Sequence, residues 1–245
     1  MLDEARRRLV FALDYPTVDD ARPVAIKIAP WVGVLKIGLE LFLREGPQAV
    51  KLAQELNLDV FLDLKLHDIP ETVGRAVAAA GALGVRYLTV HAGGGSAMLQ
   101  RAAQEAAKTD GLILLAVTVL TSLDDADLAA QGVAGGAAQH ARRLAELARA
   151  AGIRGVVTSP AEVSILRAAL GSDALLVTPG IRPLGDTTPA GDDQKRVASP
   201  TEAIAAGADL LVVGRPIRDA ADPPSAARTL VNEISRALSI STLAR

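Results

Sequence analysis

Residues 61–70 read Phe61-Leu62-Asp63-Leu64-Lys65-Leu66-His67-Asp68-Ile69-Pro70. The stretch begins as an apolar strand and then presents three charged side chains within six residues: Asp63, Lys65 and Asp68. Burying a charge is costly unless the charge is paired. Taken alone, the stretch supports two interpretations, a structural ion pair at the end of a strand or an active site.

The apolar start of this stretch has seven counterparts along the chain. These runs lie at residues 9–13, 33–38, 86–91, 111–118, 155–158, 174–178 and 209–213. Their apolar residues are consecutive rather than alternating, which is typical of parallel strands that are buried on both faces. The pattern therefore predicts eight parallel strands.

Amphipathic segments between the runs predict helices. They cover about residues 17–29, 46–56, 70–83, 124–130, 141–152, 160–170, 201–206 and 224–238, and one more follows Gly93-Gly94-Gly95. Pro70 is favourable at a helix start, because its missing N–H would have no partner there in any case. Ser96 is expected to cap the helix that follows the three glycines.

Eight strands, each followed by a helix, within 245 residues predict an α/β fold of the (β/α)8 type, a TIM barrel. A doubly wound open sheet is the alternative, but it rarely needs eight regular units in so short a chain. No linker or shift in composition divides the sequence, so residues 1–245 are expected to form one barrel domain.

The composition argues against several classes of function. A net charge of −2 gives no sign of a nucleic-acid or membrane-surface partner, and 2% aromatic residues leave few side chains to stack on bases. The chain has no cysteine, so disulfides and thiolate metal sites are excluded. Neither a signal peptide nor an apolar run long enough to span a bilayer is evident, so a cytoplasmic protein is expected.

Polar residues follow most of the predicted strands. In a barrel of this kind the carboxyl ends of the strands form the active-site face. These ends carry Asp14, Lys36, Asp63, Lys65, Asp68, His91 and Thr121. Five charges meeting at one rim favour the active-site interpretation of the opening stretch, because solvated charge belongs on the outer helices.

Residues i and i+2 of a strand share a face, so Asp63 and Lys65 should point the same way, with Asp68 arriving from the following loop. An ammonium held by two carboxylates is well placed to deliver a proton. A carboxylate near an anionic group of a substrate would instead repel it.

The ends of the seventh and eighth runs suggest phosphate binding. Barrels often hold a phosphate there through backbone N–H groups. Gly180 and Gly214 allow close approach of the backbone, and Arg182 and Arg215 provide charge and a fork of donors. The alternative is two surface arginines beside turn glycines. The loop from Pro183 to Arg196 is long for a barrel and could cover the phosphate, with Gln194 near its end.

Other candidates are weaker. Gly93-Gly94-Gly95 lacks the dinucleotide fingerprint and is interpreted as a turn. His67 and His140 have no partner visible in the sequence, and His91 is interpreted as structural or supporting. Carboxylates on the rim could hold Mg²⁺, but Lys36 and Lys65 already supply positive charge there, so no metal is expected.

These residues resemble the orotidine 5'-monophosphate decarboxylase family of bacteria along nearly the whole chain. The motif Asp63-Leu-Lys65-Leu-His-Asp68-Ile-Pro is similar to the signature of that family. Five further motifs match in order: Ala12-Leu13-Asp14, Leu35-Lys36-Ile37-Gly38, Val119-Leu120-Thr121-Ser122, Thr178-Pro179-Gly180-Ile181-Arg182-Pro183 and Val213-Gly214-Arg215-Pro216-Ile217. Asp193-Gln194-Lys195-Arg196 resembles the end of the family's phosphate loop.

The resemblance implies a carboxy-lyase that decarboxylates orotidine 5'-monophosphate to uridine 5'-monophosphate without metal or organic cofactor. It implies that Lys65 donates a proton to C6 of the pyrimidine and that Asp63 lies near the departing carboxylate. It also implies a homodimer in which Asp68 reaches into the neighbouring subunit's site.

The remaining roles also follow from the resemblance alone. Asp14, Lys36 and Thr72 would contact the ribose hydroxyls, and Thr121 would contact the pyrimidine. The phosphate would be held by Arg182, Gln194, Gly214 and Arg215. Leu66 and Glu71 depart from the family pattern, where Phe and Asn are expected, and the loop after Pro183 is longer than in many relatives.

Two rival functions fit the same motifs. A related barrel with the Asp-x-Lys-x-x-Asp motif could act on a sugar phosphate with Mg²⁺, but an acid would then be expected where Lys36 stands. A barrel without catalytic activity could bind a phosphorylated nucleotide only, which the complete set of Lys36, Asp63, Lys65 and Asp68 argues against.

Overall fold

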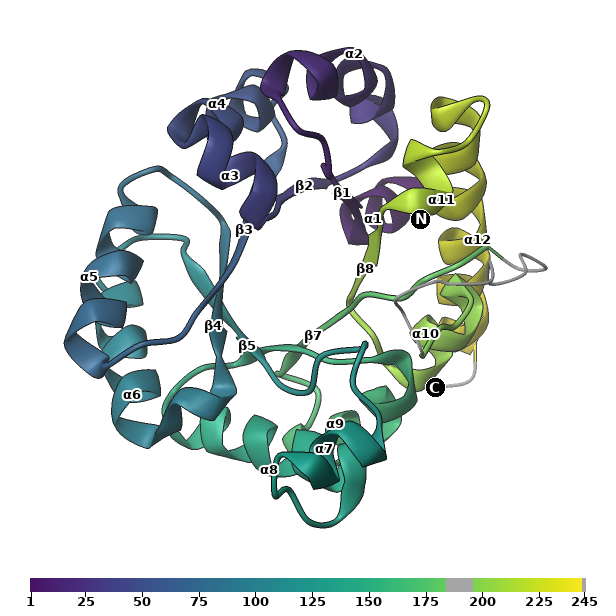
Figure 1. Cartoon of the computed structure of the whole chain (residues 1–245). Coiled ribbons are helices and arrows are strands. Elements are labelled where there is room, and N and C mark those ends of the chain that lie inside the picture. Colours follow the sequence, from purple (N-terminus) through teal and green to yellow (C-terminus); the bar gives the residue numbers. More distant parts are fainter. Residues whose placement is uncertain (184–195, 244–245) are drawn as a thin grey trace.

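The computed structural model describes residues 1–183 and 196–243. Eight parallel strands close into a barrel in sequence order, because the first strand pairs with both the second and the eighth (Figure 1). The strands are β1 (Leu9–Ala12), β2 (Val34–Ile37), β3 (Asp59–Leu66), β4 (Tyr87–His91), β5 (Ile113–Val117), β6 (Gly155–Val157), β7 (Leu175–Thr178) and β8 (Leu210–Val213). The predicted (β/α)8 barrel is confirmed.

Helices surround the strands. The α-helices are α1 (Leu2–Arg8), α2 (Val18–Ile28), α3 (Leu39–Glu45), α4 (Pro47–Glu55), α5 (Pro70–Gly81), α6 (Gly95–Ala106), α7 (Asp125–Ala130), α8 (Gly136–Ala150), α9 (Val163–Leu170), α10 (Pro200–Ala206), α11 (Arg215–Arg218) and α12 (Pro223–Leu243). Short 3₁₀ turns lie at Ala29–Trp31, Ala92–Gly94 and Pro160–Glu162. No helix in the described part of the chain is both long and apolar enough to cross a membrane.

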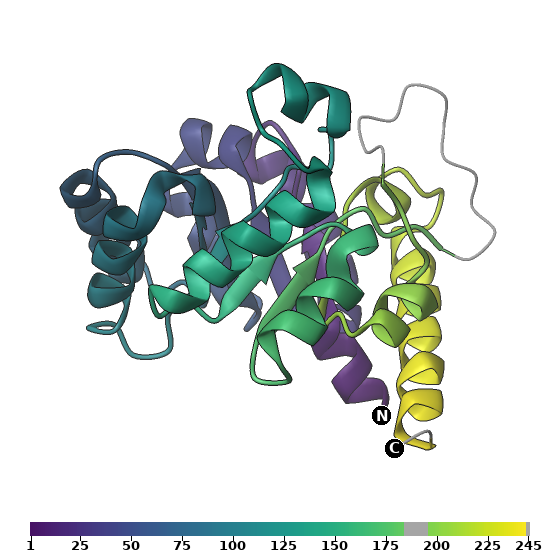
Figure 2. The ribbon, with the colours of Figure 1, turned by 90° about the horizontal axis from the view of Figure 1, so that it is seen from below.

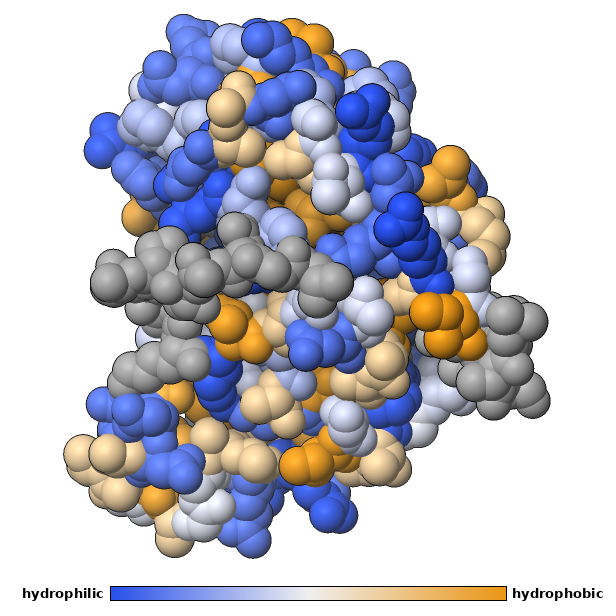
Figure 3. Space-filling model, turned by 90° about the vertical axis from the view of Figure 1, so that its right-hand side faces the viewer, coloured by the Kyte–Doolittle hydropathy of each residue, from blue (hydrophilic) through white to orange (hydrophobic). Residues whose placement is uncertain are grey.

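The two ends of the barrel are distinct. Seen from the side, α1 lies at one end and α7, which follows β5, lies at the other (Figure 2). The carboxyl ends of all eight strands therefore face the end that carries α7. On the side of the molecule seen in Figure 3, hydrophobic residues form small groups among hydrophilic ones, as amphipathic outer helices require.

Alternation along the strands divides the core into two parts. The inner part fills the barrel and consists of Val10, Ala12, Val34, Phe61, Tyr87, Leu115, Val177, Leu210 and Val212. Their neighbours in sequence, such as Phe11, Leu35 and Leu62, point outward and pack under the helices. Phe61 and Tyr87 meet edge to face with ring centroids 6.2 Å apart.

The helix expectations need correction in two respects. Helices α1, α3 and α11 are additional to those predicted. Helix α6 begins at Gly95 with Gly94 as its N-cap, so Ser96 lies inside the helix and its predicted capping role is wrong. The 3₁₀ turn at Ala92–Gly94 carries the chain into the helix two residues earlier than an N-cap at Ser96 would allow.

Candidate active site

A cavity of about 480 Å³ opens at the carboxyl ends of the strands. Its polar lining consists of Asp14, Lys36, Asp63, Lys65, Thr121, Arg182, Arg215 and Arg218, with Gly180 and Gly214 beside them. Ala12, Phe61, Val157 and Val212 form its apolar part. The inner core of the barrel is therefore the floor of this cavity.

The strand alternation explains why the charges face inward. Phe61 points into the barrel, so Asp63, two residues later on β3, lies above it on the same face. In the same way Lys36 follows the inward Val34 on β2. The charged residues Lys36 and Asp63 thus lie at the last inward positions of their apolar strands, where the barrel opens into the cavity.

At Lys65 the strand leaves regular geometry. Lys65 has a φ of +50°, and the pairing of β3 with β4 shifts register between Leu62 and Leu66. The N–H of Lys65 donates to the Thr89 hydroxyl at 2.8 Å instead of continuing the ladder. A left-handed non-glycine residue costs about 1–3 kcal/mol and persists where surrounding contacts hold it. The distortion turns the ammonium of Lys65 back onto Asp63.

Asp63 lies at the centre of a charge network. Its Oδ1 accepts hydrogen bonds from Lys65 Nζ at 2.9 Å and from the Thr89 hydroxyl at 3.0 Å. Its Oδ2 lies 3.6 Å from Lys36 Nζ, which in turn lies 3.6 Å from Oδ1 of Asp14. Acidic and amine side chains therefore alternate across the ends of β1, β2 and β3 in the order Asp14, Lys36, Asp63 and Lys65.

Burial alone would raise the pKa of Asp63, but the charges of Lys36 and Lys65 and the hydrogen bonds from Lys65 and Thr89 outweigh it and lower that pKa below its usual value. Asp63 is therefore a fixed negative charge at neutral pH. The side chain of Asp63 is only 13% exposed, whereas that of Lys65 is 33% exposed and reaches the cavity.

The opposite wall of the cavity is cationic. Arg182 follows β7 and is 9% exposed, and Arg215 begins α11 directly after Gly214. A Cβ at Gly214 would lie 3.4 Å from Oδ2 of Asp14, so glycine keeps this part of the cavity open. The backbone of Arg182 is fixed, because its N–H donates to Ala198 O at 3.0 Å. The two arginines can hold an anionic group on the side away from Lys65.

Two predicted residues that the structure describes, Asp68 and Thr72, do not line this cavity. Asp68 is exposed, and its Oδ1 accepts from the N–H of Ile69 at 2.6 Å. Thr72 lies exposed in the first turn of α5. Gln194 lies outside the described residues, as does the loop between Pro183 and Arg196.

Other residues escaped the sequence analysis. Thr89 is fully buried and holds both Asp63 and the Lys65 backbone; its signal was one hydroxyl inside an otherwise apolar run. Arg218 lies one helical turn after Arg215 and lines the same cavity. The sequence showed no partner for His67, but in the closed barrel its ring stacks on that of His91 with centroids 5.1 Å apart.

A larger hollow of about 740 Å³ lies at the opposite end of the barrel. Its lining is also charged, but it carries Glu4, Asp59, Asp173 and Asp209 beside Arg6, Arg7 and Arg8 and contains no lysine. Within residues 1–183 and 196–243, no group of three or more histidines and acids is arranged to hold a metal ion.

Comparison with known proteins identifies relatives along nearly the whole chain. The model of the "Orotidine 5'-phosphate decarboxylase / HUMPS family" matches residues 7–230. Orotidine 5'-phosphate decarboxylase of Anaeromyxobacter sp. is 55% identical over 91% of this chain and 96% of its own length. The enzyme of that name from Rhodospirillum rubrum is 52% identical over 91% of this chain and 92% of its own.

A solved structure shares the architecture. The crystal structure of orotidine 5'-phosphate decarboxylase from Lactobacillus acidophilus superimposes with a TM-score of 0.81 at 36% identity. The match covers 93% of this chain and 99% of that one.

Proposed function

The chain belongs to the orotidine 5'-phosphate decarboxylase / HUMPS family, and from this premise we propose that it is a carboxy-lyase converting orotidine 5'-monophosphate into uridine 5'-monophosphate and carbon dioxide. This is a step of pyrimidine biosynthesis. The whole chain then acts as one catalytic barrel. The observation that carries it is the Lys65 ammonium, held 2.9 Å from Asp63 at the mouth of the cavity.

The chemistry requires a proton at one carbon atom. The bond between C6 and the carboxylate breaks, its electron pair stays on C6, and carbon dioxide leaves. Lys65 Nζ donates a proton to C6, which forms the new C–H bond and leaves a neutral amine that regains a proton from solvent. The fixed charges of Lys36 and Lys65 stabilise the developing carbanion because they need no reorganisation.

Asp63 contributes in a different way. Its lowered pKa keeps it ionised beside the substrate carboxylate. Repulsion between the two negative groups is present in the bound substrate and disappears as neutral carbon dioxide forms, so it favours the transition state over the ground state.

The phosphate binds away from the bond that breaks. Arg182 and Arg215 line the wall opposite Lys65 and supply charge-assisted hydrogen bonds. Asp14 and Lys36, which lie between the two walls and 3.6 Å apart, bind the ribose hydroxyls, and Thr121 contacts the pyrimidine. Binding energy from the phosphate then serves to organise the reacting end.

Asp68 and Thr72 serve the site of a second copy of the chain. Both are exposed and lie off the cavity of their own chain, and Ile69 between them is 67% exposed. Mixing an Asp68→Ala protein with a Lys65→Ala protein tests this arrangement. Activity regained in the mixture supports shared sites, and a mixture as inactive as its parents argues against them.

The reaction itself is tested by following the ultraviolet absorbance of orotidine 5'-monophosphate with and without EDTA. Equal decay in both conditions supports decarboxylation without a metal. Decay that EDTA abolishes would favour the rival Mg²⁺-dependent chemistry, and an unchanged spectrum in both would refute the proposed function.

A further inference from the structure

Arg196 connects three loops at the active end of the barrel. It is the first described residue after position 195 and lies two residues before Ala198. Ala198 pairs with the segment after β7, since its N–H donates to Gly180 O at 3.1 Å and its carbonyl accepts from Arg182 N at 3.0 Å. The backbone that carries Arg182 is therefore paired with the backbone that carries Arg196.

The guanidinium of Arg196 reaches the other two loops. Nη2 donates to Leu120 O at 3.0 Å, and Leu120 directly precedes Thr121 in the loop after β5. Nη1 forms an ion pair with Oε1 of Glu162, in the turn after β6. One side chain thus joins the loops after β5, β6 and β7.

The contact is built into the fold. Glu162 is 2% exposed, and its other carboxylate oxygen accepts a hydrogen bond from the fully buried Ser159 hydroxyl. The side chain of Arg196 is 16% exposed. A buried carboxylate requires a partner, and a planar fork can satisfy a carboxylate and a carbonyl together, which an amine on a flexible stem does less well.

We propose that Arg196 is a positioning residue for orotidine 5'-monophosphate, setting the placement of Thr121 at the pyrimidine and of Arg182 at the phosphate through the Arg196–Glu162–Leu120 contacts. Arg196 is not among the residues that line the cavity. It acts by fixing the loop after β5, which carries Thr121, relative to the loop after β7, which carries Arg182. The inference rests on the proposed function, which assigns those two residues to the substrate.

A simple stabilising ion pair is the alternative, and the chain offers a control with the same kinds of partner in a more exposed place: the side chains of Arg149 and Asp173 are 42% and 52% exposed. The guanidinium of Arg149 also contacts one carboxylate, Asp173, and one carbonyl, Leu170 O. These contacts of Arg149 lie at the amino end of the barrel, whereas Thr121 and Arg182 line the cavity at the carboxyl end. Arg149→Gln removes a contact of the same kind without touching the substrate loops.

Arg196→Gln is expected to lower kcat/KM for orotidine 5'-monophosphate about 10- to 100-fold, as small misplacements of binding groups do. Arg149→Gln should leave kcat/KM unchanged. The readout that separates positioning from stability is a double-mutant cycle. Arg196→Gln combined with Thr121→Val should cost less than the sum of the single effects, whereas Arg149→Gln with Thr121→Val should be additive.

Arg196→Lys and Glu162→Gln provide the same comparison if Arg196→Gln does not fold, since each retains part of the contact. Suppose that the wild-type protein decarboxylates orotidine 5'-monophosphate. The inference is then overturned if these variants keep the kcat/KM of Arg149→Gln, or if the cycle with Thr121→Val is additive, and the proposed function still stands. A wild type that does not decarboxylate orotidine 5'-monophosphate overturns the proposed function, and the inference with it.

Discussion

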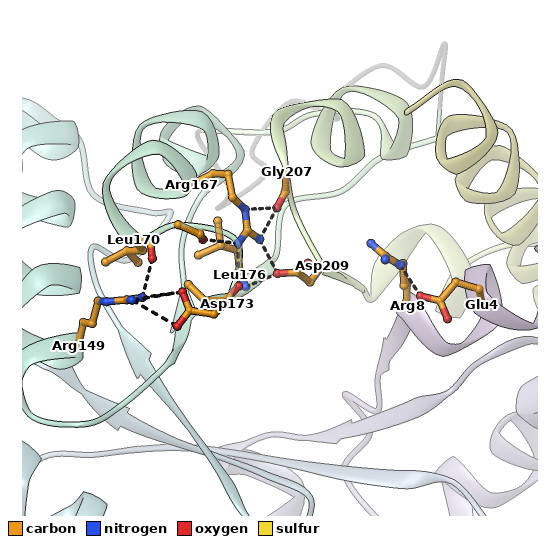
Figure 4. A network of polar contacts seen from close by, with 11 residues as sticks. Glu4, Arg8, Arg149, Arg167, Leu170, Asp173, Leu176, Gly207 and Asp209 are labelled. Atoms are coloured by element: carbon orange, nitrogen blue, oxygen red, sulfur yellow. Dashed lines mark hydrogen bonds and ion pairs between the residues drawn. The ribbon is translucent and has the colours of Figure 1, made fainter. Parts of the chain in front are cut away.

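The two ends of the barrel use similar charges for different purposes. At the amino end, the Arg167 guanidinium donates to Gly171 O and Ala174 O at 2.8 Å, to Gly207 O at 2.7 Å and to Asp209 at 2.6 Å (Figure 4). Asp209 also accepts from the N–H of Leu176. Most of these partners are backbone atoms with fixed positions, so the charge fastens loops together.

At the carboxyl end Lys65 keeps a 2.9 Å hydrogen bond to Asp63, but the contacts of Lys36 are looser. Lys36 Nζ lies 3.6 Å from both Asp14 and Asp63, beyond hydrogen-bond distance, and Lys65 extends to the cavity. Charges with such loose contacts can still interact with a ligand. The comparison teaches that charge at a barrel end does not by itself identify the site, and that the lysines and acids of the active end contact one another rather than fastening loops through backbone carbonyls.

Removing the Lys65 amine from the active end is the strongest test of the difference between the two ends. Lys65→Ala is expected to reduce kcat about 10²- to 10⁴-fold, the usual contribution of a positioned acid. Binding of uridine 5'-monophosphate should remain measurable by calorimetry. Lys51→Ala, which alters an exposed lysine on α4, is the control. A Lys65→Ala enzyme as fast as wild type would exclude the proton-donor role.

Arg215→Ala tests the cationic wall. Loss of a charge-assisted hydrogen bond worth about 1.5–3 kcal/mol predicts a fall in kcat/KM of about 10- to 150-fold for the nucleotide. The phosphate-free nucleoside orotidine should be affected far less. Steady-state kinetics on both substrates decides the point, with Arg142→Ala on the surface of α8 as the control. Equal losses on both substrates would contradict phosphate binding by Arg215.

Arg167→Gln tests the other end. It removes donors from three carbonyls and from Asp209, so the free energy of unfolding is expected to fall by about 1–3 kcal/mol. The value of kcat should stay at the wild-type level in the folded protein. Urea unfolding and the absorbance assay measure the two effects. A loss of kcat without a loss of stability would show that the amino end is not merely structural.

The fold could be predicted from the sequence because buried parallel strands leave continuous apolar runs, and eight of them alternate with helices. The period of two along a strand predicted that Asp63 and Lys65 point the same way, and both line the cavity. The left-handed conformation of Lys65 could not be predicted in this way, because it depends on a hydrogen bond to Thr89 on another strand. The stacking of His67 on His91 likewise joins residues that are neighbours only in the closed barrel.

The roles of the site residues are a separate matter. The cavity contains Asp14, Lys36, Asp63, Lys65, Thr121, Arg182, Gly214 and Arg215, whereas Asp68 and His91, which also lie at or after strand ends, do not line it. The role of each of these residues toward a substrate stays a prediction. The dimer in which Asp68 and Thr72 would serve the second site also stays a prediction. Asp68 lies on the loop after β3 and away from the cavity of its own chain. The period of two along a strand does not apply to a loop, so this position could not be predicted.

A smaller effect concerns the charge balance at the active end. Burial, together with the nearby positive charges of His67, Lys65 and His140, lowers the pKa of His91 below 6.5. The unfolded chain therefore takes up a proton at His91 before the folded protein does. The free energy of unfolding should fall as pH drops below about 6.5, by less than about 1.4 kcal/mol per pH unit for this one group.

Urea unfolding at pH 7.5 and 5.5 measures this slope. His91→Asn should flatten it, since asparagine can still accept from the N–H of Gly93 but does not titrate. His140→Asn should also flatten the slope, because burial lowers the pKa of His140 and its charge acts on His91, so this variant measures the share of His140 separately. Asp63 does not contribute in this interval: its pKa is lowered, so its share of the stability is lost only in more acidic solution. A slope that His91→Asn leaves unchanged would mean that the charges at the active end do not extend their influence to β4.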